Sequence, residues 1–150
     1  MAASPLIPRA PLIAAGAFGS ELAPALVASA IARGLRAGGV SGTDVCALDG
    51  ARLRGGALRA SLAALDFDAR MQRSRAVILA ERRLDERTLE GSAAFEIASR
   101  ARQSGVPAYA VTAHNELDSF GARVLDLQLI ITAASARALA AAGRELALVL

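Results

Sequence analysis

A chain of 150 residues is long enough to bury a hydrophobic core and is the size of one domain. Its formal net charge is +3 and all 17 basic residues are arginines, which excludes mechanisms that need an ammonium group, such as a P-loop lysine or a Schiff base. With a single cysteine, Cys46, and a single histidine, His114, we expect no disulfide within the chain and no metal site.

The high hydrophobic content does not indicate a membrane protein. Mean hydropathy is +0.40, but no uncharged run approaches the roughly 18–20 residues that span a bilayer. The first residues lack the basic region and apolar core of a signal peptide. The arginines are interspersed with acidic residues instead of forming one basic block. We therefore expect a cytoplasmic protein that binds neither membranes nor nucleic acid.

Residues 1–10 contain closely spaced prolines and are predicted as a flexible lead-in to one domain over residues 11–150. That domain opens with an apolar run suited to a buried strand. Apolar residues at helical spacing follow, with Pro24 well placed at the first helical position. In the first half we predict, in chain order, a strand at 11–17, a helix at 24–36, a strand at 44–48, a connection at 49–56 and a helix at 57–70.

The second half begins with the continuous hydrophobic run RAVILA at residues 75–80, which is typical of a strand inside a parallel sheet. The elements predicted after it are a charged loop at 81–90, a helix from Gly91-Ser92 to residue 103, a strand at 108–112, a helix at 115–124, a strand at 127–132 and a final helix capped by Ser135, with Leu139, Ala142, Leu146 and Val149 on one face. Strands that alternate with helices predict an α/β fold: a Rossmann-like three-layer sandwich with a mostly parallel sheet of about five strands.

The loop at 81–90 is the richest candidate site, because ligands of open α/β sheets bind beyond the carboxyl ends of the strands. Its arginines can hold a phosphate or carboxylate group in bidentate fashion, and Asp85 could bind a metal or accept a hydroxyl proton. The helix that follows, near Gly91 and Ser92, offers free N–H groups to an anion. The alternative is a solvated loop whose charges pair with one another. His114, after another strand, suits a surface or cap residue.

Three stretches of the chain resemble the glycerate kinase family, which uses ATP and an α/β fold without a P-loop. The family's GEGRLD segment, followed by Thr-Leu, Gly-Lys-Ala-Pro, a helix and a GVP strand opening, is similar to residues 80–111, AERRLDERTLEGSAAFEIASRARQSGVPAYAV. Its first strand, DSFKG loop and first helix resemble residues 11–36, PLIAAGAFGSELAPALVASAIARGLR. The start of its ADGGEGT loop is similar to residues 45–50, VCALDG.

This resemblance implies site residues and a reaction, the transfer of the γ-phosphoryl group of MgATP to a glycerate hydroxyl. Asp85 would be the base or the carboxylate on the metal side, and Arg83 would hold phosphate or the substrate carboxylate. ATP and Mg²⁺ are the cofactors implied for an active enzyme. The cofactor-binding positions implied are Glu81, Thr88, Gly91 and Ser92 in the third loop and Asp49 and Gly50 in the second.

The chain also departs from the family pattern. Gly16 and Gly19 stand where the first loop has Asp and Lys, Arg52 stands at the second loop's glutamate, Ala80 and Arg82 replace two glycines of the third loop, and Ser92 replaces its lysine. The family's long inserted domain is reduced to residues 51–74, enough for one helix. We therefore expect a glycerate kinase by ancestry with impaired or absent catalysis, a pseudoenzyme. The alternative is a non-catalytic module that binds a nucleotide, an anion or a partner, such as a second copy or a separate chain covering the surface left by the missing domain.

Overall fold

The computed structural model describes residues 9–48 and 54–150, so residues 1–8 of the predicted lead-in lie outside the described residues. The elements alternate in the predicted manner. In chain order they are β1 (Leu12–Ala15), α1 (Pro24–Ala37), β2 (Asp44–Ala47), α2 (Gly55–Ala64), α3 (Phe67–Gln72), β3 (Val77–Leu84), the 3₁₀ helix η1 (Glu86–Leu89), α4 (Ala93–Gln103), β4 (Ala108–Asn115), α5 (Ser119–Leu125), β5 (Leu127–Thr132) and α6 (Ala136–Ala147).

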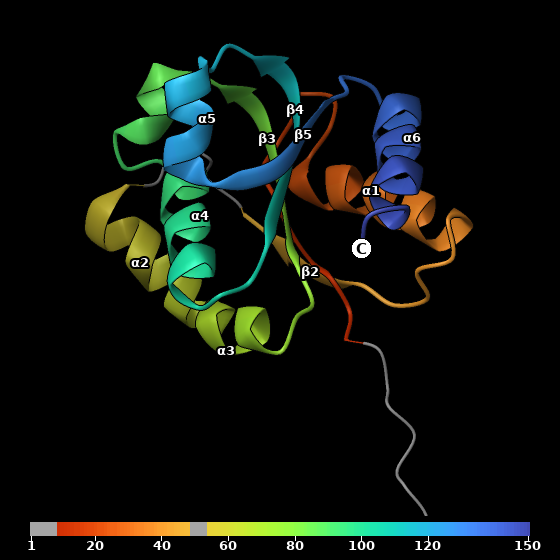
Figure 1. The fold of residues 1–150 in the computed structure, drawn as a ribbon, viewed down its shortest axis with the longest axis horizontal. Coiled ribbons are helices and arrows are strands. Elements are labelled where there is room, and N and C mark those ends of the chain that lie inside the picture. The colour runs from red at the N-terminus through yellow and green to blue at the C-terminus, as the bar shows by residue number, and fades with distance from the viewer. Residues whose placement is uncertain (1–8, 49–53) are drawn as a thin grey trace, which may run out of the picture.

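The five strands form one sheet in the order β2-β1-β3-β4-β5, and every neighbouring pair is parallel (Figure 1). From β1 the chain first adds β2 on one side and then crosses over to add β3 on the other. The order therefore reverses between β1 and β3. In a doubly wound sheet, ligands bind in the crevice beyond the carboxyl ends of the strands at such a reversal.

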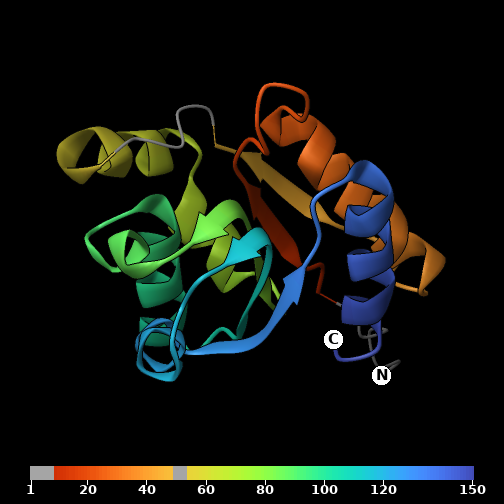
Figure 2. The ribbon, with the colours of Figure 1, turned by 90° about the horizontal axis from the view of Figure 1, so that it is seen from above.

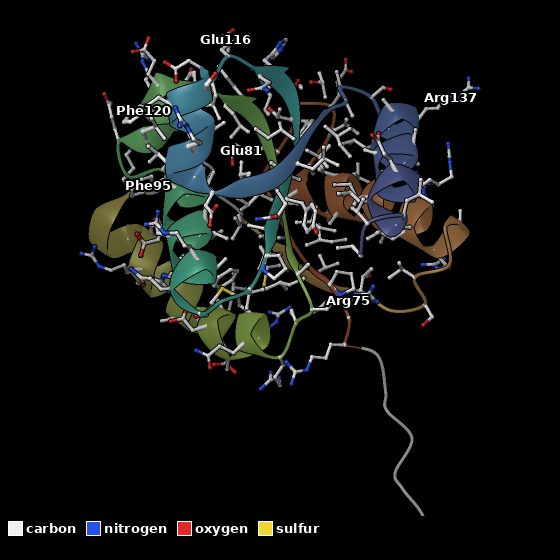
Figure 3. The ribbon with its side chains drawn as sticks, in the orientation of Figure 1. Arg75, Glu81, Phe95, Glu116, Phe120 and Arg137 are labelled. Atoms are coloured by element: carbon white, nitrogen blue, oxygen red, sulfur yellow. The ribbon has the colours of Figure 1, made fainter. Side chains whose placement is uncertain are left out.

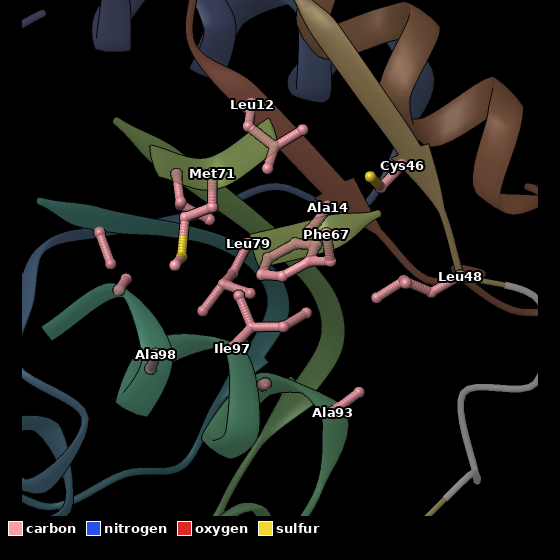
Figure 4. Close-up of a cluster of buried hydrophobic side chains, with 14 of the residues drawn as sticks. Leu12, Ala14, Cys46, Leu48, Phe67, Met71, Leu79, Ala93, Ile97 and Ala98 are labelled. Carbon is pink, nitrogen blue, oxygen red and sulfur yellow. The ribbon is translucent and has the colours of Figure 1, made fainter. Parts of the chain in front are cut away.

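Helices cover both faces of this sheet (Figure 2). Helices α1 and α6 pack on one face, in a core cluster that includes Ile13, Ile31 and Leu139. Helices α2 to α5 contribute to the core cluster on the other face, where Figure 4 shows side chains of α3, α4 and the sheet pointing toward one another. The predicted Rossmann-like three-layer sandwich is confirmed. None of the helices in the described part of the chain is long and apolar enough to cross a membrane.

The contact between α1 and α6 explains part of the glycine and alanine content of the chain. A methyl group on Gly34 would overlap the carbonyl oxygen of Ala140, and one on Gly143 would overlap that of Ile31. The two backbones therefore touch almost directly, and only residues without a side chain fit at these two positions. The layer on this face of the sheet is thin because small residues allow close approach.

Two predicted helices have different bounds. The helix at 57–70 is split into α2 and α3, because Asp66 adopts a left-handed conformation (φ 53°) that ends one helix and turns buried Phe67 into the core. The helix at 115–124 begins four residues later, at Ser119, because the Asp118 carboxylate accepts the Gly121 N–H at 2.7 Å and caps it there. Val149, predicted as part of the last helix, lies beyond α6 and is 52% exposed.

Candidate functional site

The predicted charged loop at 81–90 is wrong for its first four residues, which continue β3. Strand β4 also runs further than predicted, to Asn115, and the two strands pair through Glu81 with Thr112 and through Arg83 with His114. The fully buried Thr112 hydroxyl lies 3.1 Å from the carbonyl oxygen of Arg82, to which it donates a hydrogen bond. The Arg82 backbone is therefore extended, without the positive φ that an ancestral glycine could supply.

Five of the predicted site residues line a single pocket at the end of β3. We call it the strand-end pocket; its volume is about 130 Å³, and it is lined by Arg54, Glu81, Arg83, Asp85, Arg87, Thr88 and Ser92. Asp49 and Gly50, the two predicted site residues in the second loop, lie outside the described residues. The third loop thus brings together most of the side chains that the sequence singled out.

Asp85 and Thr88 hold each other in a reciprocal cap at the start of η1. One Asp85 carboxylate oxygen accepts the N–H groups of Arg87 at 2.9 Å and Thr88 at 3.3 Å. The Thr88 hydroxyl oxygen accepts the Asp85 N–H at 3.0 Å, and Thr88 is buried. This arrangement satisfies amides that would otherwise lack partners at a helix start. The retention of both residues therefore has a structural reason that is independent of catalysis.

Ser92 closes the same turn and begins α4. Its hydroxyl donates to the carbonyl oxygen of Thr88 at 2.7 Å and accepts the Phe95 N–H at 3.1 Å. Gly91 precedes it with φ 86°, a left-handed conformation that favours glycine, and does not line the pocket. The remaining first-turn amides of α4 lie at the positive end of an 11-residue helix. The predicted helix start is confirmed, with Ser92 itself supplying part of the cap.

The arginines of the strand-end pocket differ in their partners. A guanidinium nitrogen of Arg83 lies 2.6 Å from a carboxylate oxygen of Glu116, and both side chains are exposed. Arg54 donates to the carbonyl oxygen of Glu90 at 2.7 Å and so ties the start of α2 to the third loop. Arg87 makes no side-chain hydrogen bond or ion pair within the described part of the chain. Its charge is the one most available to a ligand.

Glu81 is a carboxyl group of the strand-end pocket whose pKa is strongly raised. Burial raises the pKa of this half-buried side chain from its ordinary 4.5 to about 7. Figure 3 places it near the upper end of the sheet, as it does Glu116, whereas Arg75 lies at the opposite end. A carboxyl group that titrates near neutral pH beside a pocket is able to accept or donate a proton there.

Sequence reasoning gave Glu81 only a cofactor-binding role and did not single out Arg54 or Glu116. Arg54 reaches the pocket from the Gly- and Arg-rich connection, 36 residues away from its partner Glu90. No local pattern in the sequence indicates such a contact. The burial and raised pKa of Glu81 likewise depend on a distant contact, because charged residues after an apolar run are typical of a loop and Glu81 stays in the sheet by pairing with Thr112.

Within residues 9–48 and 54–150, no three His, Cys, Asp or Glu side chains are grouped in a way that could hold a metal ion. Asp85, predicted on the metal side, has one carboxylate oxygen committed to backbone amides. Because Mg²⁺ in proteins is usually bound through one or two carboxylates together with phosphate oxygens and waters, the described residues offer it at most part of a ligand set.

Comparison with known proteins agrees with these features. Residues 14–142 match the sequence model of the glycerate kinase family, a range that begins in β1 and ends within α6. No curated protein matches the chain significantly. The family match includes the strand-end pocket, the end of β1 and the other four strands, and it covers most of the sequence. The chain therefore belongs to the glycerate kinase family.

Proposed function

We propose that this member of the glycerate kinase family binds the phosphate or carboxylate group of a small molecule in the strand-end pocket and does not by itself transfer a phosphoryl group. The observation that carries the proposal is the convergence of Arg54, Arg83 and Arg87, from three different elements, on one pocket. Guanidinium groups bind oxyanions through paired N–H donors. The start of α4, beside Ser92, adds the positive end of a helix dipole.

The size of the pocket limits what it can hold. A volume of about 130 Å³ is well below the roughly 300–1,000 Å³ of pockets that enclose a whole small molecule. It suits one phosphate or carboxylate group. The rest of a nucleotide or organic acid would lie outside the pocket, over its opening.

Three features argue against transfer by this chain alone. It has no lysine to offset charge that develops on phosphoryl oxygens. The Asp85 carboxylate, the implied base, is held by backbone amides. Among the described residues between β2 and β3 there are the two short helices α2 and α3, in place of the inserted domain that the resemblance implies. With no opposing wall, water reaches the transfer site.

The second candidate is the family reaction itself, transfer from MgATP to a glycerate hydroxyl, and the match over residues 14–142 favours it. When bound, Mg²⁺ would neutralise charge on the phosphate oxygens. Arg83 would orient the phosphate or the substrate carboxylate, and Glu81 would be better placed than Asp85 to receive the hydroxyl proton. A second polypeptide would have to supply the missing wall.

Calorimetric titration of the full chain with MgATP, glycerate and inorganic phosphate tests the proposal, together with a coupled assay for ADP release. We expect binding of at least one phosphate-bearing ligand without turnover, and a loss of about tenfold or more in affinity for Arg87→Gln. Arg36→Gln, in the exposed last turn of α1, removes the same charge elsewhere and should leave affinity unchanged. Glu116→Gln should strengthen binding by releasing Arg83. Equal effects of the Arg36 and Arg87 variants, or no binding, would refute the pocket assignment.

A further inference from the structure

We propose that two copies of this chain associate through the outer edge of β5, so that their two sheets join into one. Strand β5 follows β4 as the last strand on its side of the sheet. Figure 2 shows it on the same border of the molecule as α5 and the C-terminus. An edge strand presents a row of unpaired N–H and C=O groups along its outer side, and another strand can pair with them.

The residues of β5 follow the pattern of an interior strand. Its sequence, LQLIIT, contains no charged residue and no proline. Two of its apolar side chains pack on the core of each face and all four remain partly exposed: Leu127 and Ile130 on the face of α4, Leu129 and Ile131 on the face of α1 and α6. Apolar residues on both faces are typical of a strand inside a parallel sheet, whereas edge strands usually carry charged residues or proline that prevent pairing.

The other edge of the sheet, formed by β2, is protected against such pairing. Strand β2 has only four residues, and a side chain of α3 lies across its outer side. The Arg70 guanidinium donates to the carbonyl oxygen of Val45 at 2.7 Å and pairs with the Asp44 carboxylate at 2.6 Å. A short strand and a charged side chain at the edge are two of the features that keep sheets from joining. Because β5 is longer and has no charge, the two edges differ in what they can accept.

The hydrogen bonds of β5 show which of its backbone groups face outward. The Ala133 N–H donates to the carbonyl oxygen of Thr112 in β4 at 2.8 Å. The register shift between the two strands lies before Ile130, so the pairing is regular from there on. Backbone groups point alternately to the two sides of a strand. Ile130 and Thr132 therefore direct their N–H and C=O groups away from β4.

These outward groups fit a second copy of the same strand. An antiparallel pair about a two-fold axis at Ile130 joins the outward groups of the two copies and makes the interface self-complementary. In this register Leu129 lies opposite Ile131 of the second copy, and Gln128 lies opposite Thr132 of the second copy. Apolar side chains then face apolar ones, and the two exposed polar side chains face each other.

The border that contains β5 is large enough for a stable dimer. Its six residues extend about 20 Å at about 3.3 Å per residue. The three layers are about 30 Å thick, because each helix layer adds about 10 Å. Contact over this border covers about 600 Å² on each copy, or about 1,200 Å² in all, at the lower limit of stable interfaces. The C-terminus, where Leu148 and Val149 are exposed, lies on the same border and adds apolar surface (Figure 2).

Sedimentation equilibrium of the full chain over a range of concentrations tests the pairing. We expect the wild-type protein to dimerise. Gln128→Lys together with Thr132→Lys should raise the dimer dissociation constant about tenfold or more, because lysines then lie opposite each other at two places. Ala25→Lys together with Ser29→Lys adds the same charge on α1 and should leave the constant unchanged. All four positions are exposed, so both variants are expected to fold.

Amide hydrogen exchange of the wild-type protein, followed by NMR, identifies the surface where the copies meet and needs no variant. We expect the amides of Ile130 and Thr132 to be protected in the dimer and to exchange rapidly in the β5 lysine variant. A chain that stays monomeric at NMR concentrations would leave the edge to a strand of another protein and would overturn the proposal. A dimer in which these two amides exchange freely would place the interface on another surface and would overturn it too. No ligand takes part, so neither result bears on the strand-end pocket.

Discussion

Replacing Glu81 by glutamine should make the stability of the protein less sensitive to pH. The pKa of Glu81 is raised from 4.5 to about 7, so the folded protein binds a proton more tightly than the unfolded chain. Stability attributable to this group is fully present below pH 4.5 and is lost as the pH rises to about 7. Glutamine resembles the protonated carboxyl group and has no such loss.

The size of the effect follows from the shift. Each pKa unit corresponds to about 1.4 kcal/mol, so the rise to about 7 amounts to about 3 kcal/mol as a ceiling. Because Glu81 is only half-buried, solvent screening reduces this. We expect Glu81→Gln to raise the free energy of unfolding by about 1 to 3 kcal/mol at pH 8. At pH 4.5 and below the two proteins should differ little.

Urea denaturation of both proteins between pH 4 and pH 8 measures this difference directly. Glu86→Gln, which removes the same charge from an exposed position on the neighbouring 3₁₀ helix, is the matched control. A variant that gains nothing at pH 8 relative to pH 4.5 would show that Glu81 is not held in an environment that disfavours its charge.

Three other predictions concern what holds the site's framework together. Gly34→Ala should lower the free energy of unfolding by at least about 2 kcal/mol in urea denaturation, because its methyl group meets a backbone carbonyl of α6. Gly56→Ala, in open space at the start of α2, is the control and should leave the free energy of unfolding unchanged or raise it by up to about 1 kcal/mol. Asp85→Ala should lower it by about 1 kcal/mol through loss of the cap, and an unchanged melting temperature would contradict the structural role. The Arg70 hydrogen bonds hold the pKa of Asp44 below its usual 3.8, so they stabilise the folded protein at neutral pH. Arg70→Gln should therefore lower the unfolding midpoint at neutral pH, and the difference from the wild-type protein should disappear as the pH falls below 3.8, which an acid titration of the unfolding midpoint measures.

Hydrophobic patterning was sufficient to predict the layers of this fold. The run at residues 76–80 is apolar throughout because β3 is covered on both faces, and a parallel strand in that position has no polar side. The continuation of β3 through Glu81 was not predictable, since charged residues after an apolar run are typical of a loop. Here the strand is extended by pairing with β4, a contact between residues about 30 positions apart.

For the candidate site too, the sequence predicted which residues lie together but not the contacts between them. The resemblance placed Glu81, Arg83, Asp85, Thr88 and Ser92 in one region, and the structure brings these five together. What the sequence did not provide is the state of each side chain. The cap between Asp85 and Thr88, the ion pair of Arg83 and the entry of Arg54 depend on the turn geometry of η1 and on contacts distant in sequence. Such pairings decide which charges remain available to a ligand, and local patterns do not reveal them.

Binding without transfer is tested by ³¹P NMR of MgATP and glycerate with the full chain in stoichiometric amounts. We expect the ATP resonances to broaden or shift, and Arg87→Gln to weaken this effect. We also expect that no ADP or phosphoglycerate accumulates over hours. Conversion of one equivalent of ATP to ADP and phosphoglycerate, abolished by Glu81→Gln, would contradict binding without transfer and would show that the chain is a working kinase.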